Sequence, residues 1–146
     1  MLRSDPLEGR SLETAMSSLL EEFSQISNIS PHSKIKINSI LPARMQVAIY
    51  RILEEALTNI YKYSHATKVN IKLEIIPTSS HPNALEIALQ IEDNGIGFNI
   101  EQNATDFGLR GMQERAESLG GKFQVISKPK AGCRILIYFP MPLIYP

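Results

Sequence analysis

The sequence contains a single cysteine, Cys133, among 146 residues. One thiol cannot form an internal disulfide or supply a cysteine-rich zinc site, and it fits a reducing cytosol. Long hydrophobic runs are missing too, since no stretch approaches the roughly 18 apolar residues of a membrane span. The N-terminus does not follow the basic, apolar, small-residue order of a secretory signal. We therefore expect a soluble, cytoplasmic chain that makes no membrane contact, with anchoring of a longer protein left open.

An excess of charge is also lacking, because 15 basic residues balance 15 acidic ones. Proteins that bind nucleic acid usually carry a basic surface, so we expect no nucleic-acid partner. The 43% of hydrophobic and 21% of charged residues are ordinary for a soluble globular protein. The length is sufficient for one domain with a real core.

Helical periodicity is present in three regions. Residues 1–10 have none and are expected to form a flexible lead-in, after which Ser11 suits the N-cap of a first helix. A long helix is predicted over residues 43–64 and a shorter one over 109–119, which the glycine pair at 120–121 would end. The apolar face of the long helix comprises Met45, Ile49, Ile52, Ala56 and Ile60.

Strand patterns fill most of the remaining chain. Strict alternation over residues 69–75 and 85–91 predicts two strands, each with one packed and one wet face, as in an antiparallel sheet. The prolines and serines of 77–83 would join them as a hairpin. Shorter strands are expected around 35–37, from 123 and over 134–139. The pattern predicts an α+β fold, a two-layer α/β sandwich whose mixed, mostly antiparallel sheet is covered on one face by helices.

A polar stripe borders the apolar face of the long helix. Glu55, Asn59 and Lys62 are spaced i, i+4 and i+7. A carboxylate, a carboxamide and an ammonium in one row could hold a metal ion and phosphates. Taken alone, the stripe is better interpreted as the solvated edge of a helix, where such residues are common.

Two glycine-containing segments follow. Asp93-Asn94-Gly95-Ile96-Gly97 comes after the strand at 85–91, where a carboxylate could accept a hydrogen bond from the exocyclic amine of adenine. Its glycines would let the backbone approach a flat ring, although Asp-Asn-Gly is also a common hairpin turn. Gly108-Leu109-Arg110-Gly111-Met112 opens the second helix, whose N-terminal N–H groups would attract phosphate. A single glycine there could equally be a permissive helix cap.

Together these segments resemble the ATP-binding domain of sensor histidine kinases, in the superfamily shared with gyrase, the ninety-kilodalton heat-shock chaperone and mismatch-repair ATPases. Glu55-x-x-x-Asn59 looks like the N box, Asp93-x-Gly95-x-Gly97 like the first glycine box and Gly108 to Met112 like the second. The run from Gly108 to Gly121 is similar to the nitrate/nitrite-sensor subfamily. The resemblance covers about residues 34–140, and ordered motifs are more specific than one glycine pattern.

The resemblance implies the Bergerat ATP-binding fold and a division of the chain. Residues 1–30 would be the lead-in and an N-terminal helix at the tail of a truncated dimerisation region. Residues 31–142 would be the ATP-binding catalytic domain, and 143–146 a C-terminal tail. The dimerisation and phosphoacceptor helices of complete kinases are not in this sequence, so we expect a fragment that follows them.

The resemblance also assigns roles. Asp93 would recognise adenine, Asn59 would hold Mg²⁺, and Glu55 would assist catalysis. The loop at 98–107 would be a lid over bound ATP. Contacts to the nucleotide are implied for Asn59, Lys62, Asp93, Gly95, Ile96, Gly97, Gly108, Leu109, Gly111 and Met112.

The implied activity is that of a protein histidine kinase. ATP with Mg²⁺ would donate its γ-phosphate to a histidine on a separate dimerisation domain, which would pass it to a response regulator. A serine kinase or ATPase of the same superfamily and a non-catalytic partner-binding module remain alternatives. Two departures stand out: Tyr63 occupies a position where the subfamily commonly has histidine, and Cys133 one where threonine is frequent.

Overall fold

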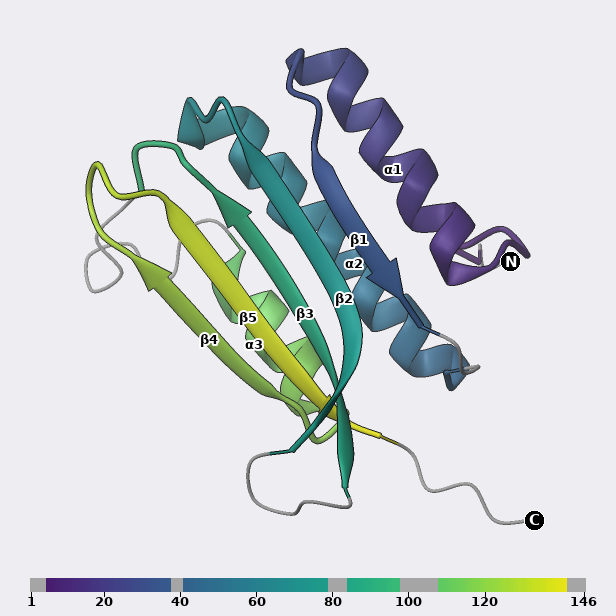
Figure 1. The fold of residues 1–146 in the computed structure, drawn as a ribbon. Helices are drawn as coiled ribbons and strands as arrows, with labels where there is room; N and C mark the ends of the chain where they lie inside the picture. Colours follow the sequence, from purple (N-terminus) through teal and green to yellow (C-terminus); the bar gives the residue numbers. More distant parts are fainter. Residues whose placement is uncertain (1–4, 38–40, 79–83, 98–107, 142–146) are drawn as a thin grey trace, which may run out of the picture.

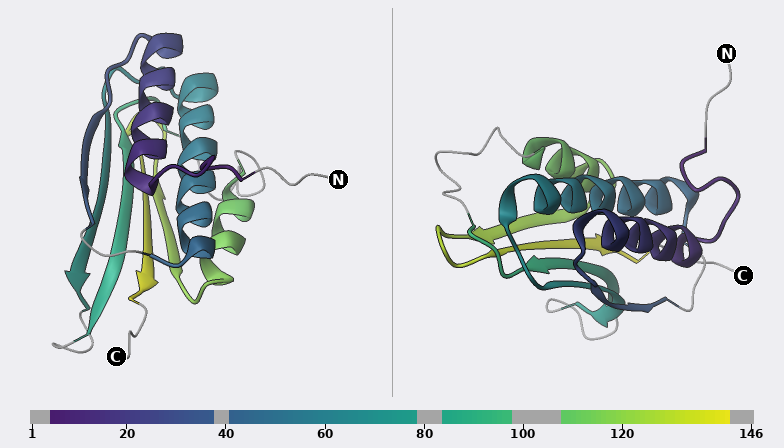
Figure 2. Two further views of the ribbon diagram at one scale, coloured as in Figure 1. Left: turned by 90° about the vertical axis from the view of Figure 1, so that its right-hand side faces the viewer. Right: turned by 90° about the horizontal axis from the view of Figure 1, so that it is seen from above.

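The computed structural model describes residues 5–37, 41–78, 84–97 and 108–141. Their elements, in chain order, are α1 (Leu12–Ser27), β1 (His32–Lys36), α2 (Ala43–Asn59), the π-helical turn η1 (Ile60–Ser64), β2 (Val69–Pro77), β3 (Leu85–Asp93), α3 (Leu109–Glu117), β4 (Lys122–Ser127) and β5 (Cys133–Pro140). The strands form one sheet in the order β1-β2-β3-β5-β4. All three α-helices lie on one face of it, with α2 between α1 and α3 (Figures 1 and 2). The predicted two-layer α+β architecture is confirmed.

The sheet is mixed, as expected. β1 runs parallel to β2, and the other neighbouring strands are antiparallel. Asp93, the last residue of β3, pairs with Val69 of β2 on one side and with Cys133 of β5 on the other. The ladder therefore places a carboxylate and a thiol next to each other at one end of the central strands.

Among the described residues, one hydrophobic core fills the space between the two layers. The side chains of β2, β3 and β5 that face the helices are buried, and those that alternate with them are more exposed. α2 contributes seven buried residues, a wider stripe than the periodicity suggested, because this helix has the sheet below it and a helix on either side. They are Met45, Ala48, Ile49, Ile52, Leu53, Ala56 and Leu57.

The N-terminal segment is more ordered than the sequence suggested. The Asp5 carboxylate accepts hydrogen bonds from the Leu7 N–H at 3.0 Å and the Gly9 N–H at 2.9 Å, and Leu7 is only 5% exposed. The prediction of a flexible lead-in is therefore wrong for residues 5–10, because a turn capped by an aspartate fixes the chain and buries a leucine. Ser11 is the N-cap of α1, as predicted, and its Oγ accepts from the Thr14 N–H at 3.1 Å.

α1 packs into the same core as the sheet, through Leu12, Ala15, Met16, Leu20 and Phe23. The division of the chain at residue 30 stays a prediction. The core that α1 shares with the sheet crosses that boundary. Residues 98–107, interpreted as a lid, and the tail at 143–146 lie outside the described residues. No helix within the described ranges combines the length and the apolar character that a membrane crossing needs.

The long helix differs from the prediction at its end. α2 stops at Asn59, and the chain continues through the wider turn of η1 to His65, whose φ of 54° is left-handed. The Ser64 Oγ donates to the Ile60 carbonyl oxygen at 2.7 Å inside this turn. A wider turn breaks the helical spacing, so Lys62 does not continue the stripe that Glu55 and Asn59 begin.

Candidate functional site

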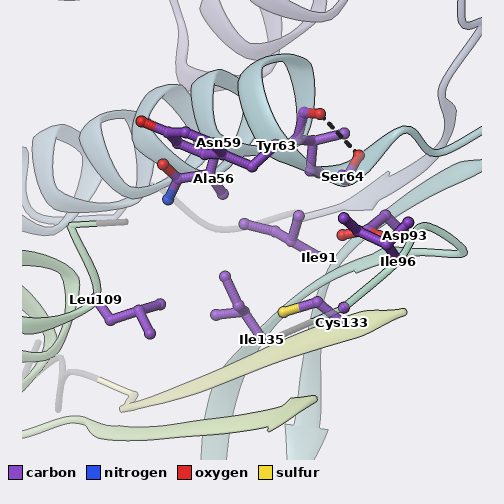
Figure 3. Close-up of a pocket in the computed structure, with 12 residues that line it drawn as sticks. Ala56, Asn59, Tyr63, Ser64, Ile91, Asp93, Ile96, Leu109, Cys133 and Ile135 are labelled. Carbon is purple, nitrogen blue, oxygen red and sulfur yellow. Dashed lines mark hydrogen bonds between the residues drawn. The ribbon is translucent and has the colours of Figure 1, made fainter. Parts of the chain in front are cut away.

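One end of the helical layer and one end of the sheet enclose a pocket of about 260 Å³. The end of α2 with η1, the ends of β3 and β5, and the start of α3 contribute its walls (Figure 3). Most of its surface is apolar. The lining residues are Ala56, Asn59, Ile60, Tyr63, Ser64, Ile91, Asp93, Ile96, Gly97, Leu109, Cys133 and Ile135.

Asp93 is the buried acid of this pocket, with 8% of its surface exposed. Burial raises the pKa of its carboxyl, and the neighbouring charge of Glu92 adds a smaller rise. A hydrogen bond from the Gly95 N–H to the Asp93 Oδ1, at 2.8 Å, acts in the opposite direction on that pKa. Because an ionised carboxylate has acceptor sites for several donors, Asp93 can still accept a hydrogen bond from a ligand.

Cys133 lies beside that acid on β5. Burial, followed by the charge of Asp93, raises the pKa of the Cys133 thiol to about 12, and a hydrogen bond with Ser127 offsets part of the rise. The thiol is therefore protonated at neutral pH and a poor nucleophile. Cys133, which stands where threonine is frequent in the family, lines the pocket. Its thiol contributes a weakly polar surface next to Asp93.

The three residues of the polar stripe on the long helix lie in different places in the structure. Asn59, the last residue of α2, lines the pocket and is half-buried. Glu55 is exposed and lies one turn earlier, outside the lining, with its carboxylate against Gly108 at the start of α3. Lys62 is also exposed and outside the lining. The structure thus brings Asn59 to the pocket, Glu55 to the start of α3, and Lys62 to neither.

The glycines of the first glycine box are required by the protein's own backbone. A Cβ at Gly95 would overlap the Ser64 carbonyl group, and a Cβ at Gly97 would overlap the Lys128 carbonyl oxygen. Gly97 also has a φ of 66°, which favours glycine. The motif predicted a flat ligand against these glycines, whereas in the structure the empty Cβ positions face neighbouring segments of the chain.

The second glycine box contributes differently at each position. Gly108 is the N-cap of α3 with a φ of 65°, and Gly111 lies in the first turn with open space where a Cβ would be. Leu109 lines the pocket, whereas Met112 is 1% exposed and belongs to the core.

Sequence reasoning missed several lining residues. Ala56 and Ile60 lie on the apolar face of the helix, and Ile91 and Ile135 pair across β3 and β5 on the buried face of the sheet. Their pattern is that of ordinary core residues, so no local signal marks them as pocket walls. Ser64 was not considered because the π-helical turn that presents it was not foreseen.

The residues present fit a Mg²⁺ ion that is held mainly by a bound nucleotide. Among the described residues, no group of three or more histidine, cysteine, aspartate or glutamate side chains could hold a metal. Mg²⁺ often takes only one or two protein oxygens and completes its shell with phosphate oxygens and water. The carboxamide oxygen of Asn59 is a suitable donor of that kind.

Known proteins share both the sequence pattern and the fold. The chain is 33% identical over 141 residues to the sensor histidine kinase LiaS of Bacillus subtilis, covering 96% of this chain and 37% of the relative. It is 36% identical over 103 residues to the sensor protein VraS of Staphylococcus saprophyticus, covering 69% of this chain and 27% of the relative. The chain thus spans between about a quarter and somewhat over a third of the length of these curated relatives.

Solved structures show the same fold. The histidine kinase domain of a blue-light activated histidine kinase from Erythrobacter litoralis aligns over 97% of this chain and 66% of that chain, with a TM-score of 0.66 and 16% identity. The histidine kinase AdeS of Acinetobacter baumannii aligns over 91% of this chain and 66% of that chain, with a TM-score of 0.66 and 21% identity.

The sequence profile of one family, the histidine kinase-, DNA gyrase B- and HSP90-like ATPases, matches residues 45–143. That match covers more than half of the chain and includes every residue that lines the pocket. The resemblance to sensor histidine kinases stated from the motifs is confirmed by these relatives. The chain therefore belongs to the histidine kinase-, DNA gyrase B- and HSP90-like ATPase family, and this membership implies that it binds ATP.

Proposed function

We propose that the chain binds Mg·ATP in this pocket and that the bound nucleotide donates its γ-phosphate to a histidine on a separate dimerisation domain. The phosphoryl group would then pass to an aspartate of a response regulator. The observation that supports this most is the buried carboxylate of Asp93 in an apolar pocket, with the carboxamide of Asn59 entering from the helical layer. Apolar walls with a few polar groups are typical of small-molecule sites.

In this proposal Asp93 selects adenine over guanine. The side chains of Ile91 and Ile135 form an apolar surface next to it, on which a flat ring can pack. An ionised carboxylate accepts a hydrogen bond from the 6-amino group of adenine. Guanine has a carbonyl oxygen at that position, which would face the carboxylate without a proton between them and would be rejected.

The start of α3 and the end of α2 provide the phosphate side. Asn59 would hold Mg²⁺, which neutralises phosphate charge when bound. The N-terminal N–H groups of α3, reached past Gly108 and Gly111, favour an anion. Lys62 stays a proposed phosphate contact, although its side chain is exposed outside the pocket lining.

Glu55 is proposed to assist the attack. Its carboxylate lies against Gly108, at the start of the helix where the phosphates are expected. There it could accept a proton from, or orient, the imidazole that attacks the γ-phosphorus while the bond to the β–γ bridging oxygen breaks and ADP leaves.

The names of the relatives favour this function over the alternatives. LiaS is named a sensor histidine kinase, and VraS a sensor protein. A non-catalytic partner-binding module would have no use for a buried carboxylate inside an apolar pocket. A serine kinase or ATPase of the same family would share the pocket, so the chemical nature of the phosphorylated residue decides between them.

Incubation with γ-labelled ATP tests the transfer step. The chain alone is expected to incorporate no label. Addition in trans of the phosphoacceptor helices of a full-length sensor histidine kinase relative should give an acid-labile label on those helices, which Asn59→Ala abolishes. Strong labelling of the chain by itself would contradict transfer to a separate domain. An acid-stable label on serine would contradict histidine phosphorylation.

A further inference from the structure

The loop that follows β3 is hydrogen-bonded to the connection between η1 and β2. The Asn94 N–H donates to the Lys68 carbonyl oxygen at 3.2 Å. The Asn94 Oδ1 accepts from the backbone N–H groups of Thr67 and Lys68, each at 2.8 Å. Its Nδ2 donates to the Thr67 Oγ1 at 2.9 Å. Both ends of the Asn94 carboxamide are therefore bonded to Thr67, and its oxygen is bonded to Lys68 as well.

A second set of contacts joins the same loop to the end of η1. The Ile96 N–H donates to the Ser64 carbonyl oxygen at 2.8 Å, and the Ser64 Oγ accepts from the Ala66 N–H at 3.0 Å. Gly95 packs so closely on the Ser64 carbonyl group that a Cβ would overlap it. The loop after β3 and the segment after α2 are thus bonded directly to each other.

Asp93 lies at the root of this loop. Its Oδ1 accepts from the Gly95 N–H at 2.8 Å, so the direction of the carboxylate depends on where the backbone goes after it. Asn94 is the residue between the two, and its side-chain bonds fix that course. Asn94 is exposed and is not among the pocket's lining residues, so its effect on a ligand would pass through Asp93.

We infer that Asn94 is a positioning residue of the nucleotide site, which holds the Asp93 carboxylate in the direction that base recognition requires without touching the nucleotide. This inference rests on the proposed function. The sequence alone predicts only a turn at Asn94. Its partners Thr67 and Lys68 are about 26 residues earlier in the chain, so no local pattern indicates these bonds.

Calorimetric titration of the 146-residue chain with Mg·ATP tests the inference. Asn94→Ala removes the carboxamide bonds and should lower the affinity about tenfold, since a few exposed hydrogen bonds of modest net strength are lost. The matched control is Asn70→Ala, which makes the same change at an exposed asparagine of β2. Its affinity should stay within about twofold of the wild type.

The pH dependence of binding separates positioning from a general loss of stability. If Asn94 keeps the Gly95 N–H on the carboxylate, then Asn94→Ala weakens a bond that lowers the pKa of Asp93. The pH at which half of the affinity is lost should therefore move upward in Asn94→Ala. A general loss of stability, measured as a lower thermal melting midpoint, would not by itself move that pH.

The conservative variant should restore binding. Asn94→Asp keeps an acceptor for the two backbone N–H groups, and at a pH where both carboxylates are ionised its affinity should recover to within about threefold of the wild type. Other titratable neighbours of Asp93 are Glu92 on the same strand and Cys133 on β5.

The outcomes distinguish this inference from the proposed function. A folded wild-type chain that does not bind Mg·ATP would overturn both. A wild-type chain that binds, together with an Asn94→Ala variant of equal affinity and equal pH profile, would overturn the positioning role alone. If Asn94→Ala does not melt cooperatively, Thr67→Val replaces it, because it removes only the bond from Nδ2 to Oγ1. A two- to threefold loss, roughly, is then expected, and no loss overturns the inference.

Discussion

At the scale of single residues, the pocket holds one carboxylate whose ionisation is unfavourable in the free protein. Asp93 is buried next to Glu92 and opposite Cys133, and both its burial and the nearby charge disfavour ionisation. A ligand amine that donates to the ionised carboxylate would remove part of this cost. Two consequences for pH and stability can be measured.

The first concerns nucleotide affinity. The pKa of Asp93 is raised in the free chain, and a ligand N–H selects the ionised form, so binding lowers that pKa. Affinity for ATP should be full above the raised pKa and should fall, by at most about tenfold per pH unit, as the pH drops through it. Calorimetry in two buffers of different ionisation enthalpy should also detect proton release on binding near that pKa. Equal proton counts with and without Asp93→Asn would contradict this.

The second concerns the stability of the free chain. Because the folded state holds the Asp93 proton more tightly than the unfolded state, stability should fall as the pH rises from the ordinary value of 3.8 to the raised value, and stay lower above it. Asp93→Asn removes the charge while its Oδ1 can still accept from the Gly95 N–H. At neutral pH this variant should melt at or above the wild-type temperature and bind ATP about 10- to 100-fold more weakly. A large drop in melting temperature would show that the ionised carboxylate stabilises the fold.

At the scale of elements, the start of α3 faces both the pocket and Glu55. Gly108 and Gly111 are three residues apart, yet their surroundings differ, since one has a left-handed φ beside a carboxylate and the other an open helical position. This contrast separates a glycine needed for the fold from a glycine needed for a ligand.

Gly111→Ala should therefore have opposite effects on stability and binding. Alanine is the better helix former, and nothing lies within 4 Å of the new Cβ, so the free chain should gain about 0.5–1 kcal/mol. If phosphates approach the first turn of α3, ATP affinity should nevertheless fall several-fold. Gly108→Ala should instead destabilise the chain, because its φ of 65° is strained for alanine. Denaturant unfolding and titration measure the two effects, and unchanged ATP affinity in Gly111→Ala would remove this turn from the site.

The elements also show what the sequence could predict. The alternation over 69–75 and 85–91 predicted β2 and β3 because one face of each strand is buried, and a buried face determines a period of two. The π-helical turn at Ile60–Ser64 was not predictable from periodicity. It is fixed by bonds that Ser64 makes to Ile96 and Ala66, and the first of these partners is distant in sequence.

The candidate site shows the same division. Asn59, Asp93, Ile96, Gly97 and Leu109 were predicted from the motifs and line the pocket, although their roles stay predictions. The apolar walls could not be told from core residues, because burial against a ligand and burial against the protein give the same pattern. Lys62 was placed on the stripe by assuming a regular helix, and the turn after Asn59 removes that regularity.

At the scale of the whole molecule, one core joins α1 to the sheet and the other helices. Met16 is fully buried in α1, whereas Ile26 of the same helix is 59% exposed. An N-terminal helix that only continued a dimerisation region would have little effect on the unfolding of the rest.

Met16→Ala should therefore destabilise the entire chain by about 2–5 kcal/mol, in a single cooperative transition. Ile26→Ala, at the exposed position, should change the free energy of unfolding by less than about 0.5 kcal/mol. Chemical denaturation followed at two wavelengths would reveal two separate transitions if α1 were an independent unit.

The measurement that tests the central claim most directly is calorimetric titration of the chain with ATP, with and without Mg²⁺, for the wild type and for Asp93→Ala. The account predicts saturable binding by the wild type, tighter with Mg²⁺, and loss of that binding in a folded Asp93→Ala variant. Binding that survives Asp93→Ala unchanged would place the nucleotide elsewhere, and a folded wild type without binding would contradict the proposed function.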